Sequence, residues 1–114
     1  GTGSPYREFL HADDLANALF FLMQNYDGLE FVNCGSGVEI TIKDLALLVK
    51  EIVGYEGEIV HDTTKPDGTP RKLTDVSKIH DLGWKHTISL RDGIESVYKE
   101  FSENYDAIIN KYKA

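Results

Sequence analysis

The first part of the chain combines a short extended run with an amphipathic pattern. Residues 6–11 read Tyr-Arg-Glu-Phe-Leu-His and predict an extended segment. From Asp13, placed as an N-cap, apolar residues recur with the spacing of one helix face until about Asn25. Gly28 follows, where a helix stop is expected. The pattern therefore predicts a strand followed by a helix over residues 13–25.

Two more strands and three more helices are predicted along the rest of the chain. The strands are expected at residues 31–34, before the turn Gly35-Ser36-Gly37, and at residues 58–61. The helices are expected over residues 42–53, 75–82 and 89–112, with Thr41, Asp75 and Ser89 as their N-caps and the last one continuous. This order of elements is typical of a small mixed α/β domain with short strands and several helices, and residues 1–114 are expected to form that single domain.

A stiff cationic loop interrupts this pattern at residues 65–75. Pro66 and Pro70 fix the backbone and remove two donors, so the loop is neither helix nor central strand, and Asp67-Gly68 between them predicts a tight turn. The loop presents three cations around one turn: Lys65, Arg71 and Lys72. Two interpretations are open, a site for an anion and a solvated connection with incidental charges.

Composition and charge exclude several classes of protein. The chain has 114 residues, 41% of them hydrophobic, and a net charge of −7, which argues against general binding to nucleic acid or to an anionic membrane. Its one cysteine allows no internal disulfide, its four histidines have no metal-ligand spacing, and no apolar run is long enough to span a membrane. A cytoplasmic protein is the expectation. The only methionine is Met23, so we expect an excised piece of a longer chain, in which Gly1–Ser4 are either native or a cloning scar.

The chemistry that the chain lacks is as informative as the chemistry it carries. No glycine-rich dinucleotide fingerprint and no Tyr-x-x-x-Lys pair is present, and we expect Cys34, Ser36 and His11 to have structural roles. Two distant cationic sites remain, Arg7 on the first extended run and Arg71-Lys72 on the loop. If both face one cleft, a guanidinium and an ammonium can hold a diphosphate, with Asp67 as the acceptor for a sugar hydroxyl or a base N–H.

Three stretches resemble one known family. Residues 7–14 (Arg-Glu-Phe-Leu-His-Ala-Asp-Asp) resemble the Arg-Glu-Phe-Leu-His-Val-Asp-Asp segment of the GDP-L-fucose synthases, which are extended short-chain dehydrogenases/reductases. Residues 31–37 resemble the strand and glycine turn of that family, and residues 65–73 (Lys-Pro-Asp-Gly-Thr-Pro-Arg-Lys-Leu) match its cationic loop almost letter for letter. Leu82-Gly83-Trp84, followed by Ile88-Ser89-Leu90, completes the order. Ala12 and Cys34 depart from the commoner residues of the family.

The resemblance implies a carboxy-terminal, substrate-binding part whose Rossmann half, with its NADP site and catalytic residues, lies upstream. Carried over by position, Arg7 and Lys72 would contact the diphosphate of a GDP-sugar, and Asp67 and Arg71 would line the same pocket. NADP would bind to the full-length enzyme and not to this chain, which would be inactive alone and could form a homodimer through exposed apolar surface. Two alternatives stay open, another NAD(P)-dependent nucleotide-sugar epimerase or dehydratase, and a non-catalytic binding module.

Overall fold

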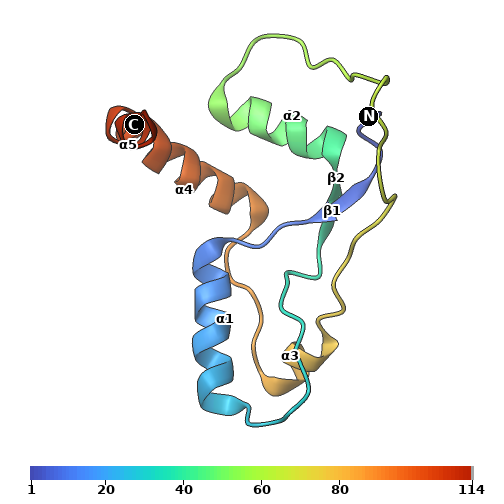
Figure 1. Ribbon diagram of the computed structural model, residues 1–114, viewed down its shortest axis with the longest axis vertical. Helices are drawn as coiled ribbons and strands as arrows, with labels where there is room; N and C mark the ends of the chain where they lie inside the picture. Colours follow the sequence, from blue (N-terminus) through green and yellow to red (C-terminus); the bar gives the residue numbers. More distant parts are fainter. Residues whose placement is uncertain (114) are drawn as a thin grey trace.

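The structure is a computed structural model that describes residues 1–113. Over these residues the chain forms five helices and one two-stranded sheet (Figure 1). In chain order the elements are β1 (Tyr6–Glu8), α1 (Ala12–Asn25), β2 (Glu39–Thr41), α2 (Ile42–Val53), α3 (Ser77–Leu82), α4 (Leu90–Glu103) and α5 (Tyr105–Tyr112). Helices α1 and α3 lie below the sheet in Figure 1, α2 lies above it, and α4 and α5 lie to its left. The predicted mixed α/β class is confirmed.

Strand β1 is central to the arrangement because chain segments lie on both of its edges. On one edge it pairs with β2 in antiparallel register, Arg7 opposite Ile40. On the other edge Tyr6 forms a parallel bridge with Arg71, through Tyr6 N–H to the Pro70 carbonyl at 2.9 Å and Lys72 N–H to the Tyr6 carbonyl at 3.4 Å. The cationic loop is therefore fixed to the same strand that carries Arg7.

Two of the predicted strands were wrong, and one observed strand was missed. Over residues 1–113 the structure assigns no strand at 31–34 or at 58–61. A strand needs a neighbour for its backbone N–H and C=O groups, and β1 already has neighbours on both edges. The missed strand is β2, whose three residues carry too little alternation to stand out in the sequence.

The helix ends show which capping signals were reliable. Thr41 and Ser89 cap α2 and α4 as predicted, with their hydroxyl oxygens accepting from the N–H groups of Asp44 and Asp92. The prediction for α1 was wrong, because His11 Nδ1 accepts from Asp13 N–H at 3.0 Å and the helix begins at Ala12. A neutral imidazole nitrogen can accept at this position just as a carboxylate does.

The predicted continuous terminal helix is divided in two. Helix α4 ends at Glu103, and α5 begins at Tyr105 after a break at Asn104 with φ −115° and ψ 16°. The apolar residues along α4 are only partly covered, since Val97 and Phe101 are 55% and 42% exposed. Leu90 and Ile94, nearer the sheet, are partly covered.

The small core lies between α1 and α3. Ala18, Val76, Ile79 and Trp84 are buried there, and the Trp84 indole N–H donates to Asn17 Oδ1 at 2.9 Å. The Cα radius of gyration is 17.2 Å, whereas a compact domain of this length has about 13 Å. The chain therefore buries little of its apolar surface within itself.

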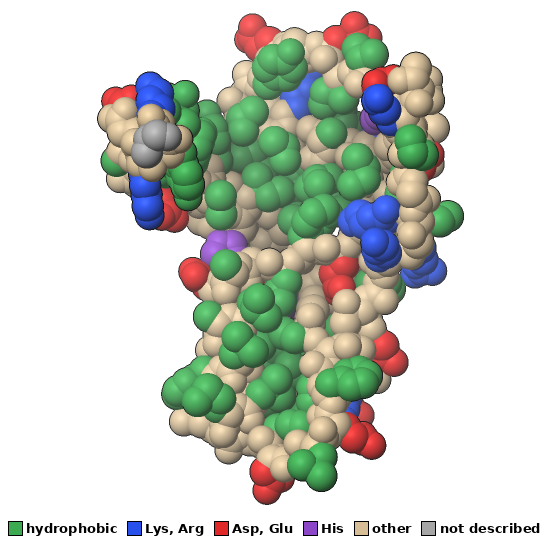
Figure 2. Space-filling view, viewed as in Figure 1, with side chains coloured by type: hydrophobic (Ala, Val, Ile, Leu, Met, Phe, Trp, Pro, Cys, Tyr) green, Lys and Arg blue, Asp and Glu red, His purple; other side chains and the backbone are tan. Residues whose placement is uncertain are grey.

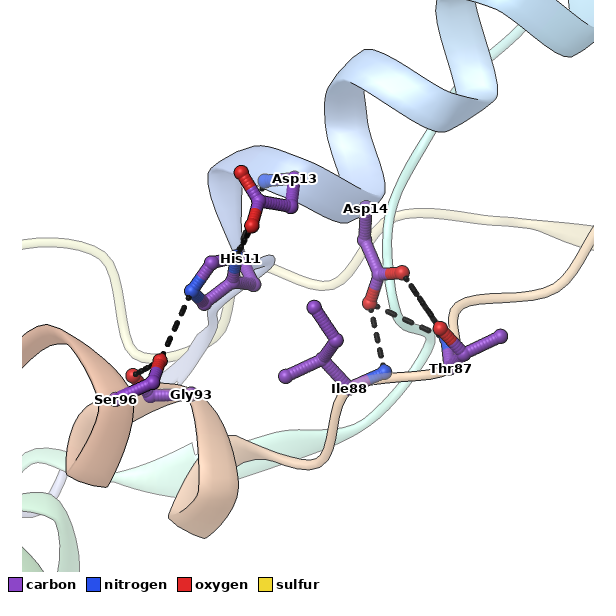
Figure 3. Close-up of polar contacts among 7 residues, drawn as sticks. All are labelled: His11, Asp13, Asp14, Thr87, Ile88, Gly93 and Ser96. Atoms are coloured by element: carbon purple, nitrogen blue, oxygen red, sulfur yellow. Dashed lines mark hydrogen bonds and ion pairs between the residues drawn. The ribbon is translucent and has the colours of Figure 1, made fainter.

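A buried carboxylate connects α1 to the segment that leads into α4 (Figure 3). Asp14, only 3% exposed, accepts from the N–H groups of Thr87 and Ile88 at 3.2 and 2.9 Å and from the Thr87 hydroxyl at 3.1 Å. Beside it His11 Nε2 lies 3.4 Å from Ser96 Oγ on α4. The Ser96 hydroxyl also donates to the Gly93 carbonyl at 2.9 Å. These contacts hold the start of α1 against residues 87–88 and α4.

Candidate functional site

The pleat of the central strand decides which cations share a face. Side chains alternate between the two faces of a strand, and residues paired across strands point to the same face. Tyr6 is paired with Arg71, so the next residues along, Arg7 and Lys72, lie together on the opposite face. The sequence placed Arg7 and Lys72 on one side of the molecule, and the register agrees with that placement.

The guanidinium of Arg7 lies against the cationic loop. Its Nη1 donates to the Tyr6 carbonyl at 2.6 Å, and its Nη2 is 3.9 Å from the point where a Cβ on Gly68 would lie. Gly68 has φ +75°, so the predicted tight turn needs a residue that tolerates left-handed backbone. The side chain of Arg7 is half-buried and is held in place on its strand.

Lys72 is exposed, and within residues 1–113 its ammonium is in no ion pair or side-chain hydrogen bond. Figure 2 shows Lys and Arg side chains gathered at the narrow middle of the molecule, where β1 and the loop run in Figure 1. The hollow beneath the loop is lined by other residues, including Pro5, Ile42 and Pro66. Lys72 therefore lies on an open surface, and the side chain of Arg7 is partly exposed.

Arg71 occupies the other face of the strand. Its Nε donates to Glu39 Oε2 and its Nη2 contacts Glu39 Oε1, both at 2.7 Å. Since residue 71 lies on one edge of β1 and β2 lies on the other, this bidentate ion pair crosses the strand. The register brings Arg7 and Lys72 together and separates Arg71 from them, so a role for Arg71 in the same pocket stays a prediction without geometric support.

Asp67 turns toward the start of the chain. Its carboxylate accepts from the Thr2 N–H and from the Thr2 hydroxyl, the latter at 2.7 Å. These two hydrogen bonds hold the pKa of Asp67 below its usual value. Asp67 is thus an ionised acceptor, as expected, but its acceptor sites face Thr2, and its role toward a sugar or a base stays a prediction.

Glu8 is the residue that sequence reasoning missed. Its carboxylate accepts from Gly37 N–H, from the Ser36 hydroxyl at 3.4 Å and from Thr74 N–H at 3.2 Å. Burial alone would raise the pKa of Glu8, but the hydrogen bonds from Thr74, Gly37 and Ser36 hold it below its ordinary value. Its position beside Arg7 in the extended run was the only available signal. Glu8 connects the glycine turn to the last part of the cationic loop.

The same carboxylate excludes a phosphate from the glycine turn. A Cβ at Gly35 would lie 2.7 Å from Glu8 Oε2, and the N–H of Gly37 is already donated to that oxygen. A dinucleotide site instead presents free N–H groups to a pyrophosphate. The Gly37 N–H is therefore not available to a pyrophosphate.

The other candidate chemical groups have structural surroundings. Burial, followed by the charges of Asp14 and Glu8, raises the pKa of Cys34, which disfavours the thiolate. Ser36 Oγ donates to Glu8 and contacts the Val38 carbonyl at 3.3 Å, as a turn serine does. No cluster of His, Cys, Asp or Glu suited to a metal ion occurs in the described part of the chain. None of the described helices combines the length and apolarity needed to cross a membrane.

Comparison with known proteins extends this picture. No protein-family model matches the chain. It is 64% identical over 104 residues to putative GDP-L-fucose synthase 2 of Arabidopsis thaliana and 62% identical over 104 residues to probable GDP-L-fucose synthase 1 of Oryza sativa subsp. japonica. This chain is related to the carboxy-terminal part of the GDP-L-fucose synthases.

The match covers most of this chain and a minor part of each relative. It includes 91% of the chain and 32% of both plant GDP-L-fucose synthases. Among solved structures, a GDP-L-fucose synthetase from Naegleria fowleri bound to NADP aligns with a TM-score of 0.88 at 30% identity, over 93% of this chain and 34% of that one. The chain thus spans about a third of the length of the GDP-L-fucose synthases it matches.

Proposed function

We propose that this chain is the substrate-binding part of a GDP-L-fucose synthase, an enzyme that converts GDP-4-keto-6-deoxy-D-mannose to GDP-L-fucose. The observation that carries the proposal is the register that sets Arg7 and Lys72 side by side on one face of β1. Both lie in the stretches that resemble the family. We treat residues 1–114 as one unit of that enzyme.

In this proposal the two cations bind the diphosphate of the GDP-sugar. A guanidinium offers two parallel N–H donors to phosphate oxygens, and an ammonium offers a compact charge. Binding strips water from a dianion, and only cations that converge on it offset that loss. The prolines of the loop reduce the conformational entropy lost when the loop closes around the ligand.

The catalytic residues and the NADP site belong to the amino-terminal part in this account. NADP, when bound there, supplies the hydride that reduces the 4-keto group of the sugar. The NADP-bound Naegleria structure supports a cofactor in the whole enzyme, and the glycine turn filled by Glu8 argues against one on this chain. The residues described here bind and orient substrate.

The first test is catalytic. The full-length protein that carries this chain is expected to oxidise NADPH with the keto-sugar, and the isolated 114-residue chain is expected to show no turnover. Its coding sequence upstream should contain Gly-x-x-Gly-x-x-Gly and Tyr-x-x-x-Lys. Turnover by the isolated chain would contradict the assignment of catalysis to the amino-terminal part. An upstream sequence without these motifs would favour a non-catalytic module.

The missing amino-terminal half is also proposed to cover the exposed apolar surface. Large apolar side chains stand open on the outer face of α1 and just after it: Leu19, Phe20, Met23, Leu29 and Phe31, with exposed fractions from 55% to 105%. Hydrophobic patches, drawn in green, are visible in both the upper and the lower part of the molecule in Figure 2. A monomeric protein rarely exposes a contiguous apolar patch of this kind. We refer to these five residues as the α1 apolar face.

This surface leads to a second expectation. The isolated chain should self-associate through the α1 apolar face and form a dimer or larger species in sedimentation velocity at about tens of micromolar. The double variant Phe20→Ser, Met23→Ser should shift the isolated chain toward monomer. Val60→Ser, which removes another exposed apolar residue away from that face, is the matched control. A chain that stays monomeric at every concentration would contradict the expectation.

A further inference from the structure

The back face of the site, opposite Arg7 and Lys72, carries an ion pair of good geometry. Arg71 and Glu39 make two contacts of 2.7 Å, and the Glu39 side chain is only 21% exposed. Most exposed ion pairs contribute little, but a bidentate guanidinium–carboxylate pair is directional and fixes both partners. Here the partners belong to segments on either side of β1, so the pair fastens the cationic loop across the strand.

The backbone alone holds the loop weakly. Within residues 1–113, two backbone–backbone hydrogen bonds join it to β1, one at 2.9 Å and one at 3.4 Å, and Pro70 has no N–H to add a third. A slip of one residue in such a pairing moves every side chain to the other face. Lys72 would then leave Arg7, and Arg71 would replace it.

We propose that Glu39 is a positioning residue that, by pairing with Arg71, sets the register in which Lys72 stands beside Arg7. This inference rests on the proposed function and assigns a task to the back of the same site. Glu8 adds a second attachment on the same face, because its register partner is Glu39 and it accepts from Thr74 N–H at 3.2 Å. Arg71 in this account is the anchor of the loop and does not touch the diphosphate.

The ion pair also affects the electrostatic field of the site. Pairing with Glu39 neutralises one of the two adjacent loop cations, so the positive field at the open face comes from Arg7 and Lys72. A carboxylate at position 39 is therefore expected to favour the binding of an anion, although it is itself negative. Simple charge counting would predict the opposite effect of removing it.

The test uses the full-length enzyme and the variants Glu39→Gln, Arg71→Gln, their combination, and the charge swap Glu39→Arg with Arg71→Glu. Each single variant is expected to weaken GDP binding, and to raise KM for the GDP-sugar, by about 3- to 10-fold, with kcat and NADPH affinity unchanged. The double glutamine variant should lose no more than either single one. The charge swap should restore affinity to within about twofold of wild type, since it rebuilds the pair.

Three results would overturn the inference. If Arg71 contacts the diphosphate, the charge swap will bind worse than either single variant. If Glu39 merely supports the fold, the melting temperature, kcat and NADPH affinity will fall together with GDP affinity. If the glutamine variants bind GDP like wild type, the Arg71–Glu39 pair does not set the register of the loop on β1. Lys72→Ala separates this inference from the proposed function: when it weakens GDP binding and Glu39→Gln does not, only the positioning role fails.

Discussion

Asp14→Asn is expected to destabilise this chain by about 2–3 kcal/mol. The carboxylate is 3% exposed and accepts from two backbone N–H groups and one hydroxyl of residues 87 and 88. An asparagine keeps the shape but replaces one acceptor oxygen with an N–H donor, which faces N–H groups and leaves them unsatisfied. Urea denaturation followed by circular dichroism measures the change in the free energy of unfolding.

Asp13→Asn is the matched control. Asp13 is the neighbouring acid, its side chain is 84% exposed, and its carboxylate lies 3.9 Å from His11 Nδ1. Its replacement is expected to change stability by no more than about 0.5 kcal/mol. Equal effects at the two positions would mean that the attachment of α1 to residues 87 and 88 contributes nothing specific.

The contribution of the Asp14 carboxylate to stability should depend on pH. Burial would raise the pKa of Asp14, but hydrogen bonds from Ile88 and Thr87, with the nearby His86, hold it below its ordinary value. A group whose pKa is lower in the folded state stabilises that state above its unfolded pKa, about 3.9 for Asp, and this stability is lost as pH falls through the folded value. Wild type should therefore lose stability more steeply than Asp14→Asn below about pH 5. Parallel curves would contradict this.

Lys72→Ala is expected to weaken GDP-sugar binding to the full-length enzyme by about 10- to 150-fold, the equivalent of one charged hydrogen bond. Arg7→Lys should also weaken it, because an ammonium cannot reproduce the two parallel donors of a guanidinium. NADPH affinity should change little in both variants, since the NADP site is proposed to lie on the amino-terminal part of the enzyme.

Lys65→Ala is the control for these two variants. Lys65 is exposed at the start of the same loop, and its charge is lost without disturbing the paired segment at residues 70–72. It should change GDP-sugar affinity by less than about threefold, the general effect of charge on an open surface. If Lys65→Ala and Lys72→Ala weaken binding equally, the loop acts only through its net charge.

The sequence predicted the local features of the fold better than its strand pairing. Thr41, Gly54 and Ser89 act through their own backbone neighbours, so their roles as helix boundaries could be predicted from adjacent residues. Residues 31–34 have the composition of a strand, but a strand also needs a partner, and none of the described segments supplies one. The apolar stripe of α4 is periodic as predicted, yet periodicity cannot say whether a covering surface is present.

The candidate site could be predicted in part, because residue type can be read from the sequence and strand register cannot. Arg7 and Lys72 could be chosen from residue type and from family resemblance, because both carry the charge that a diphosphate needs. Arg71 has the same charge, and only the register shows that it lies on the other face with Glu39. Glu8 lies in a stretch that resembles the family and Glu39 does not, but neither could be recognised, since a carboxylate with a structural partner is indistinguishable in sequence from one in solvent.

The most direct test of the shared diphosphate site is a comparison of GDP and guanosine by calorimetric titration of the full-length enzyme and its Lys72→Ala variant. The two ligands share a base and a sugar, and only GDP carries the diphosphate. Our account predicts that Lys72→Ala weakens GDP binding by at least about 10-fold and leaves guanosine binding unchanged. An equal loss for both ligands, or no loss for GDP, would contradict it.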